Sequence, residues 1–295
     1  MLPDIHLPHQ IRRIQHAGHD CLRLNVAHGS AIVALHGAHL FSWLPTGQRE
    51  VFWLSPMALP EPSPIRGGIP VCWPYFARQG QPPDAPQHGL VRTQQWQVTH
   101  AERTEDGEIV LALAGPEVPE VPMNVILTMR IGRALEQALT TVNLSKETVR
   151  FTQALHTYFR VADADCVHVT GLDGLTYADK FDNFNKHTQR GDWNLQDARD
   201  RGRSDRIYGD TGSQFELIDP AGHRKIRLAT SGSKTLVVWN PGAEFIKTFA
   251  DLPPEGWRNY VCLEAANCGA EVIELGTDDS HVLQQTISVA ALTAH

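Results

Sequence analysis

Apolar and polar residues alternate with a period of two along much of the chain. The clearest segments are 22–26, 139–144, 151–160 and 235–239. Because successive side chains of a strand point to opposite faces, this period predicts β-strands. Turn clusters containing Gly or Pro separate the segments, and no long stretch has the 3.6-residue apolar period of a helix. The pattern predicts an all-β protein, a large antiparallel β-sandwich or a barrel.

Two segments depart from strand character. Residues 55–86 are rich in proline, and residues 191–210 are polar and crowded with Arg and Asp. We expect both to be long loops, in which binding groups are often held by a rigid scaffold. Neither a Ser/Gly linker nor a shift in composition marks a boundary, so residues 1–295 are predicted to form a single domain.

Composition excludes several classes of protein. The 295 residues include 33 acidic and 26 basic side chains, a net charge of −7 without basic blocks, which disfavours nucleic acid as a partner. No run reaches the roughly 18 apolar residues of a membrane-spanning helix. The five cysteines form no CxxC pair, so we expect free thiols, a reducing compartment and no metal site. The first residues lack the apolar core of a signal peptide, which favours the cytoplasm.

Two glycine-containing segments present cations. Arg66 precedes Gly67 and Gly68, and the segment Gln87-His88-Gly89-Leu90-Val91-Arg92 follows about twenty residues later. Glycine allows a close approach of the backbone to a ligand. Guanidinium groups match the geometry of phosphate or carboxylate, so two arginines could grip one anion. Ordinary surface ion pairs are the alternative.

The segment Phe151–Arg160 predicts a strand with two different faces. Phe151, Leu155 and Phe159 fall on one face, whereas His156 and Tyr158 fall on the other. A polar and aromatic face is typical of a sugar-binding surface. The alternative is a histidine on an exposed sheet face that a neighbour satisfies.

A carboxylate stands in an apolar strand near the C-terminus. Glu264 lies in the middle of the segment Asn259–Asn267, and glutamate is rarely buried without a partner or a purpose. If Glu264 and His156 face one cavity, they supply the two titrating groups that a proton relay requires. A glutamate that points to solvent is the alternative.

Taken together, these segments resemble the hexose-6-phosphate mutarotases, a branch of the aldose 1-epimerase superfamily. The resemblance covers most of the chain and runs in the family's order through these segments: Arg66-Gly67-Gly68-Ile69-Pro70, Gln87-His88-Gly89, Leu155-His156-Thr157-Tyr158-Phe159, residues 171–180, Asp205-Arg206-Ile207-Tyr208, Val238-Trp239-Asn240-Pro241 and Cys262-Leu263-Glu264. Two departures are Leu90-Val91 in place of Phe-Ala and Arg203 in place of an acidic residue.

The resemblance implies a large antiparallel β-sandwich with the sugar site on a concave face. It implies that His156 is the catalytic acid and Glu264 the base. It also implies that a second set of residues contacts the substrate: Arg66, Gln87, His88, Arg92 and Asp205. The expected activity is the interconversion of the α and β anomers of a hexose 6-phosphate, with glucose 6-phosphate favoured, by a monomer that uses no cofactor.

The chemistry needs only a base and an acid. The C1 hydroxyl loses a proton while the ring oxygen gains one, and reversed transfers close the ring after a rotation. At reference pKa values, Glu264 is expected to start ionised, and His156 can donate if a nearby anion raises its pKa. Two alternatives remain at this point. One is a non-catalytic carbohydrate-binding or sugar-sensing module, and the other is a glycosidase that uses Asp205 and Glu264.

Overall fold

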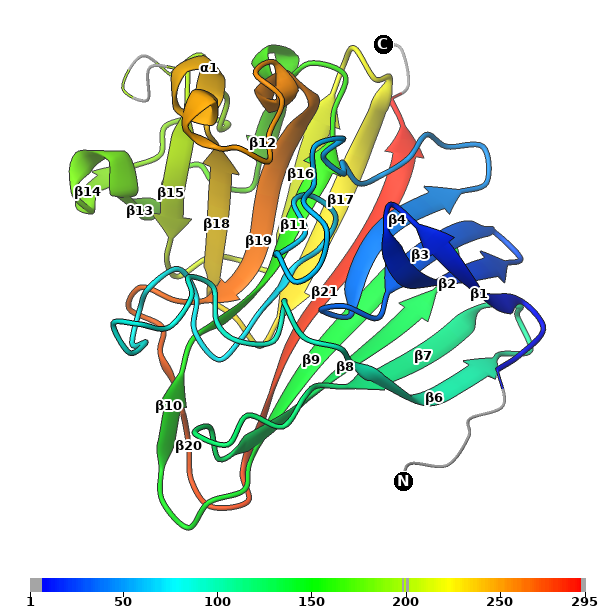
Figure 1. Cartoon of the computed structure of the whole chain (residues 1–295). Helices are drawn as coiled ribbons and strands as arrows, with labels where there is room; N and C mark the ends of the chain where they lie inside the picture. Colours follow the sequence, from blue (N-terminus) through cyan, green and yellow to red (C-terminus); the bar gives the residue numbers. More distant parts are fainter. Residues whose placement is uncertain (1–6, 198, 200–201, 293–295) are drawn as a thin grey trace.

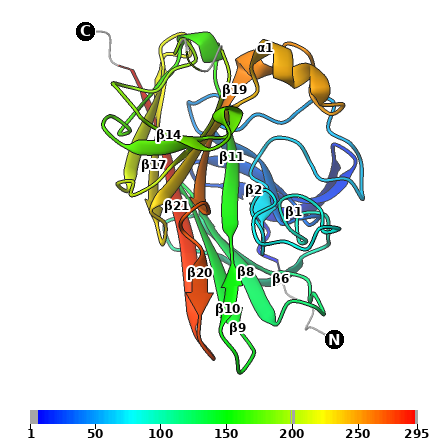
Figure 2. The same cartoon turned by 90° about the vertical axis from the view of Figure 1, so that its left-hand side faces the viewer.

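The computed structural model describes residues 7–197, 199 and 202–292. Two large antiparallel sheets pack face to face, and two smaller sheets lie at the side and at the lower end of this pair (Figure 1; Figure 2). The alternating segments of the sequence form strands, so the predicted all-β antiparallel sandwich is confirmed.

One large sheet has eight strands. In spatial order they are β12 (His168–Thr170), β16 (Gln214–Asp219), β17 (Arg224–Ser231), β21 (Ser280–Ala291), β9 (Leu135–Asn143), β8 (Met123–Ile131), β7 (Ile109–Ala114) and β6 (Gln97–Arg103). Buried and more exposed positions alternate along β8 and β9. One face of this sheet therefore packs on the core while the other meets solvent.

The other large sheet has seven strands. In spatial order they are β14 (Asn185–Thr188), β13 (Thr176–Asp179), β15 (Ser204–Tyr208), β18 (Thr235–Asn240), β19 (Tyr260–Asn267), β11 (Gln153–Arg160) and β5 (Val71–Cys72). Every residue of β18 and β19 is buried, so neither face of the sheet centre is widely exposed to bulk solvent. Thr157 on one face hydrogen-bonds Gln285 of the eight-stranded sheet at 3.1 Å, which leaves the opposite face for a ligand.

The remaining elements are short. The four-stranded sheet contains β1 (Ile11–His16), β2 (His19–Val26), β3 (Gly29–Ala34) and β4 (His39–Pro45), and β10 (Val149–Phe151) pairs with β20 (Ile273–Leu275). The helical turns are α1 (Gly242–Phe245) and the 3₁₀ turns Ala164–Cys166, Lys180–Asp182, Ile246–Thr248 and Gly256–Asn259. Across the described ranges, no helix is long and apolar enough to cross a membrane.

The predicted loop 191–210 is wrong in its second half. Residues 204–208 form β15, which pairs with β13 on one side and β18 on the other. The predicted loop 55–86 is largely confirmed and contains only the two-residue strand β5.

The role expected for Gly67 and Gly68 is also corrected. Both have positive φ angles, of 102° and 60°, and a Cβ at either position would clash with backbone atoms of Trp53 or Leu40. These glycines therefore allow close packing of the chain on itself, and the neighbouring Arg66 is the residue that lines the cleft.

Candidate active site

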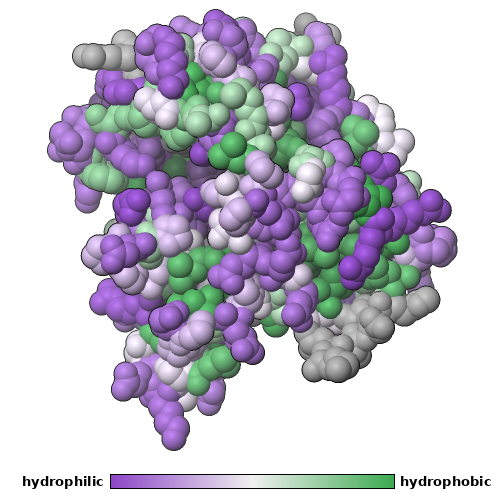
Figure 3. All heavy atoms as spheres, in the orientation of Figure 1, coloured by the Kyte–Doolittle hydropathy of each residue, from purple (hydrophilic) through white to green (hydrophobic). Residues whose placement is uncertain are grey.

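A large cleft lies on the free face of the seven-stranded sheet. In Figure 3 the surface is hollowed over β18, and both hydrophobic and hydrophilic residues border the hollow. Seven lining residues are those that the sequence singled out: Arg66, Gln87, His88, Arg92, His156, Asp205 and Glu264. The fold thus brings all seven to one cavity, although they come from segments up to about 200 residues apart.

The acid–base pair is set by the register of β11 and β19. His156 and Glu264 are directly opposite in this antiparallel pair, and His156 Nε2 lies 3.4 Å from Glu264 Oε1. Their exposed fractions are 7% and 1%. The two alternatives weighed from the sequence, an exposed histidine and a glutamate that points to solvent, are therefore wrong.

Burial controls the protonation of this pair. It raises the pKa of Glu264 well above its ordinary value, and nearby Asp205 adds to the rise. It lowers the pKa of His156 well below its ordinary value, and the positive charges of Arg66 and Arg92 lower it further. Both directions favour the neutral forms. The expectation that Glu264 starts ionised beside a His156 of raised pKa is therefore corrected: in the free cleft the shared proton belongs on the carboxyl group.

Aromatic rings fix the orientation of His156. The ring of Tyr158 stacks on it at 4.9 Å with an interplanar angle of 8°, and His88 meets it edge-on at 5.4 Å. The backbone N–H of Ala77 donates to His88 Nδ1 at 3.3 Å, and the side-chain amide nitrogen of Gln87 lies 3.2 Å from His88 Nε2. Burial and Arg92 lower the pKa of His88, which keeps this ring neutral.

Arg66 is clamped from three sides. Its Nε donates to Asp251 Oδ2 at 2.9 Å, and its Nη1 donates to the hydroxyl of Tyr158 at 3.1 Å. The guanidinium carbon lies 5.2 Å from the centre of the Phe249 ring. The Nη2 atom makes none of these hydrogen bonds. The contacts at Nε and Nη1 therefore hold the guanidinium group in a fixed orientation in which Nη2 can donate to an anion.

Arg92 and Gln87 lie beyond His156, on the side of β5. Arg92 Nη2 donates to the backbone oxygen of Gln87 at 2.8 Å, and within the described chain no carboxylate forms an ion pair with Arg92. Gln87 is exposed at the cleft mouth. Arg92 and Gln87 therefore present a guanidinium group and an amide group to a ligand in the cleft.

Asp205 projects from β15 into the other half of the cleft. Its carboxylate lies 3.0 Å from Lys180 Nζ. Burial raises the pKa of Asp205, while Lys180 opposes that rise. An aspartate held in this way can accept a hydrogen bond from a sugar hydroxyl.

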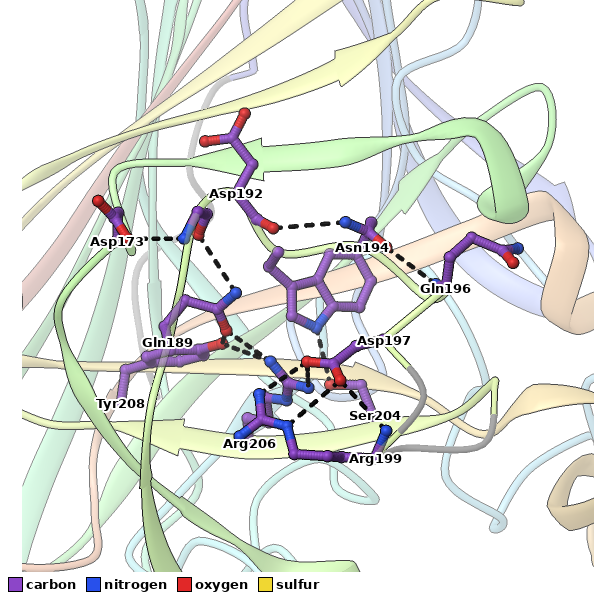
Figure 4. Close-up of polar contacts among 12 residues, drawn as sticks. Asp173, Gln189, Asp192, Asn194, Gln196, Asp197, Arg199, Ser204, Arg206 and Tyr208 are labelled. Atoms are coloured by element: carbon purple, nitrogen blue, oxygen red, sulfur yellow. Dashed lines mark hydrogen bonds and ion pairs between the residues drawn. The ribbon is translucent and has the colours of Figure 1, made fainter.

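The residues that flank Asp205 anchor β15 from the opposite face of the sheet (Figure 4). Ser204 donates to the backbone oxygen of Val238 at 2.9 Å and accepts from Trp193 at 3.0 Å. Arg206 is fully buried and pairs with Asp197 at 2.8 Å. Arg203, the departure from the family pattern, stacks on the ring of Phe181 at 3.9 Å. Asp205 therefore lies on an anchored strand even though Arg203 stands where the family pattern has an acidic residue.

One group of side chains has the chemistry of a metal site. Ligand atoms of His156, Cys262 and Glu264 lie within 4.8 Å of one another, and no other such group occurs in residues 7–197, 199 and 202–292. The cations Arg66 and Arg92 act electrostatically on His156 and would repel a divalent ion there. The expectation that no metal takes part stays a prediction.

Three cleft or clamp residues were missed in the sequence. Lys180 is the last residue of the family-like segment 171–180 and has no role in the sequence-based prediction. The strand pattern predicts the face of Tyr158 but not its partner. Asp251 carries no local signal, because its partner Arg66 is 185 residues away in the chain. Only the tertiary structure reveals these contacts.

Comparison with known proteins finds relatives that match most of the chain. The family model for aldose 1-epimerase matches residues 20–288. A candidate glucose-6-phosphate 1-epimerase of Escherichia coli K12 is 32% identical over 269 residues, which is 88% of this chain and 87% of the relative. Its counterpart in Salmonella typhimurium is 31% identical, with the same coverage.

A solved structure shows the same relationship. A candidate mutarotase from Salmonella typhimurium superposes with a TM-score of 0.87 at 28% sequence identity, over 98% of this chain and 97% of the other. The match extends over almost the whole of both chains. The protein belongs to the aldose 1-epimerase family.

Proposed function

We propose that this enzyme interconverts the α and β anomers of a hexose 6-phosphate, with glucose 6-phosphate as the favoured substrate. The observation that carries the proposal is the buried pair His156 and Glu264, 3.4 Å apart, in a cleft that also presents Arg66 and Arg92. An acid–base pair suits ring opening, and the two guanidinium groups suit a phosphate.

Catalysis requires the charged form of the pair. Glu264 as carboxylate takes the proton of the C1 hydroxyl, and protonated His156 gives a proton to the ring oxygen, so the C1–O5 bond breaks and an open-chain aldehyde forms. Rotation about C1–C2 and the reversed transfers close the ring on the other face. A phosphate dianion at Arg66 and Arg92 reduces their repulsion of protonated His156. Substrate binding therefore favours the form that reacts.

Magnetization-exchange NMR tests the activity directly. Exchange between the two anomeric protons is measured for glucose 6-phosphate and for glucose, with and without the protein. Faster exchange of the phosphorylated sugar is expected. Absence of acceleration on both sugars would favour the non-catalytic sugar-binding module, and hydrolysis of a glycoside would favour the glycosidase.

Several broader assignments belong to the same proposal. We treat residues 1–295 as one domain that acts as a monomer in the cytoplasm, without a nucleic-acid partner. One core cluster that includes residues from Ile11 to Ile287 supports the single domain. The five cysteines are free, and four of them are buried, which fits a reducing compartment.

Replacing Lys180 with methionine is expected to move the acid limb of the pH–rate profile to higher pH. Lys180 lowers the pKa of Asp205 and also that of Glu264 and His156. Without Lys180, the carboxyl groups of Glu264 and Asp205 take up their protons at a higher pH, so kcat/KM falls earlier on acidification. His156, which must be protonated to react, also keeps its proton to a higher pH, so the basic limb moves in the same direction. The measurement is kcat/KM for glucose 6-phosphate between pH 5 and 8, with Lys186→Met as the matched cleft cation. An unchanged limb would show that Lys180 does not act on these groups.

Activity is expected to survive exhaustive chelation. The proposed steps use side-chain acid–base chemistry and no added group. Anomer exchange is measured before and after dialysis against EDTA, with anomer composition followed by polarimetry as a second readout. A loss that zinc or magnesium restores would contradict the prediction and direct attention to Cys262 beside the catalytic pair.

A further inference from the structure

The cleft is larger than one hexose phosphate requires. Its volume is about 1270 Å³, whereas sites for drug-sized ligands typically hold about 300–1,000 Å³. The groups already assigned to phosphate and catalysis, Arg92, His156 and Glu264, lie at the β5 side of the sheet. The cleft continues from Glu264 towards β14, and in that half the activity proposed above uses only Asp205 of β15 and its partner Lys180.

Strand register places a straight row of side chains along this half. Consecutive members are cross-strand partners and all line the cleft: His156, Glu264, Val237, Ile207, Ala178 and Lys186. Four strand spacings of about 4.8 Å separate Glu264 from Lys186, a length of about 19 Å. This row is long enough for a second ring beyond the one that reacts.

The floor and walls of this half have the chemistry of a sugar site. Val237, Ile207 and Ala178 form an apolar strip that suits the C–H face of a pyranose. The wall residue Phe184 is 56% exposed although it lines the cleft. Its backbone has a φ of 61° and follows Asn183 at 52°, an uncommon conformation for two successive non-glycine residues. A strained turn thus holds an aromatic ring at the cleft mouth.

The row ends at Lys186 of β14, and a second lysine of the cleft lining, Lys234, directly precedes β18. The lining also contains the acidic residues Asp210 and Glu271. Within the described part of the chain, neither Lys186 nor Lys234 forms an ion pair through its side chain. Both line the cleft, in a protein whose net charge is −7. The exposed Lys186 at the end of the apolar strip suits a ligand that carries an acidic group at that point.

We propose that the half of the cleft between Glu264 and Lys186, here called the distal subsite, binds a second glycosyl unit that carries a phosphate or carboxylate group. This unit is joined to the aldose whose anomers are exchanged. The proposal rests on the function proposed above and leaves its chemistry unchanged, since the same C1–O5 bond opens and closes. It extends the substrate class to acidic disaccharides with a free reducing end.

The test compares four sugars by exchange NMR: glucose, maltose, maltose 6′-phosphate and glucose 6-phosphate. Contacts with Phe184 and the apolar strip should raise kcat/KM for maltose about three- to tenfold over glucose. The 6′-phosphate should add about two- to fivefold through the exposed Lys186. A matched disaccharide with a terminal uronic acid distinguishes carboxylate from phosphate recognition.

Two variants locate the effect. Ala178→Trp fills the strip and should abolish the gain for both disaccharides while exchange of glucose 6-phosphate is kept, and Ala178→Ser is its conservative control. Lys186→Met should remove only the gain from the 6′-phosphate, whereas Lys146→Met, outside the cleft, should not. Phe184→Ala provides a second test if Ala178→Trp fails to fold.

Two outcomes distinguish failure of the subsite from failure of the proposed function. If glucose 6-phosphate exchanges rapidly but neither disaccharide exchanges faster than glucose, the distal subsite is overturned. If all four sugars exchange slowly, the proposed function is overturned instead.

Discussion

Glu264→Gln and His156→Ala are each expected to lower the rate of anomer exchange on glucose 6-phosphate by about two to four orders of magnitude, the usual value of a positioned proton transfer. The two side chains are cross-strand partners 3.4 Å apart, so each variant removes one end of the relay. Glutamine cannot accept the C1 proton, and alanine leaves no acid for the ring oxygen. Exchange NMR on purified protein measures the loss.

The double variant separates a relay from two independent contributions. Because one group cannot act without the other, the double loss should be close to the larger single loss and far below the product of the two. Cys262→Ala, two residues from Glu264 on the same face of β19, is the matched control and should keep most of the activity. Thermal unfolding shows whether each variant folds. Near-normal exchange by a folded single variant would remove that residue from the mechanism.

The strands that could be predicted from the sequence have one apolar and one polar face. Strand β15 was missed because both of its faces carry polar groups. Asp205 faces the cleft, while Arg206 is fully buried on the other side against Asp197. A strand that buries charge on both faces has no apolar alternation to detect, and its sequence resembles a loop. Its pairing with β13 and β18 is a property of the tertiary structure.

The sequence predicts which residues form the site but not their protonation states. Motifs identified the side chains, and sheet register then placed His156 opposite Glu264. Protonation depends on burial and on every charge nearby, which no local motif contains. Reference pKa values therefore placed the proton on His156, whereas burial places it on Glu264 in the free cleft.

Arg66→Ala and Arg92→Ala are expected to reduce kcat/KM for glucose 6-phosphate by about one to two orders of magnitude each, because a hydrogen bond to a charged group contributes about 1.5–3 kcal/mol. Glucose has no phosphate to lose, so its rate should change far less. The preference for the phosphorylated sugar should narrow in both variants. Added salt should narrow it more mildly, since Arg66 and Arg92 are partly exposed.

The two arginines differ in what else they hold, and this difference sharpens the test. Arg66→Ala leaves Asp251 without its ion-pair partner at 2.9 Å, so some loss of stability is expected. Comparison with Asp251→Ala, which breaks the same ion pair but keeps Arg66, shows how much of the loss in kcat/KM is structural. Arg92 has only the backbone oxygen of Gln87 as a polar partner among the described contacts, which makes Arg92→Ala the cleaner measurement. Arg203→Ala, which removes a nearby guanidinium outside the cleft lining, is the matched control for loss of charge. Equal losses on both sugars would show that these arginines hold loops or ring hydroxyls, and the assignment of a phosphate clamp would then be withdrawn.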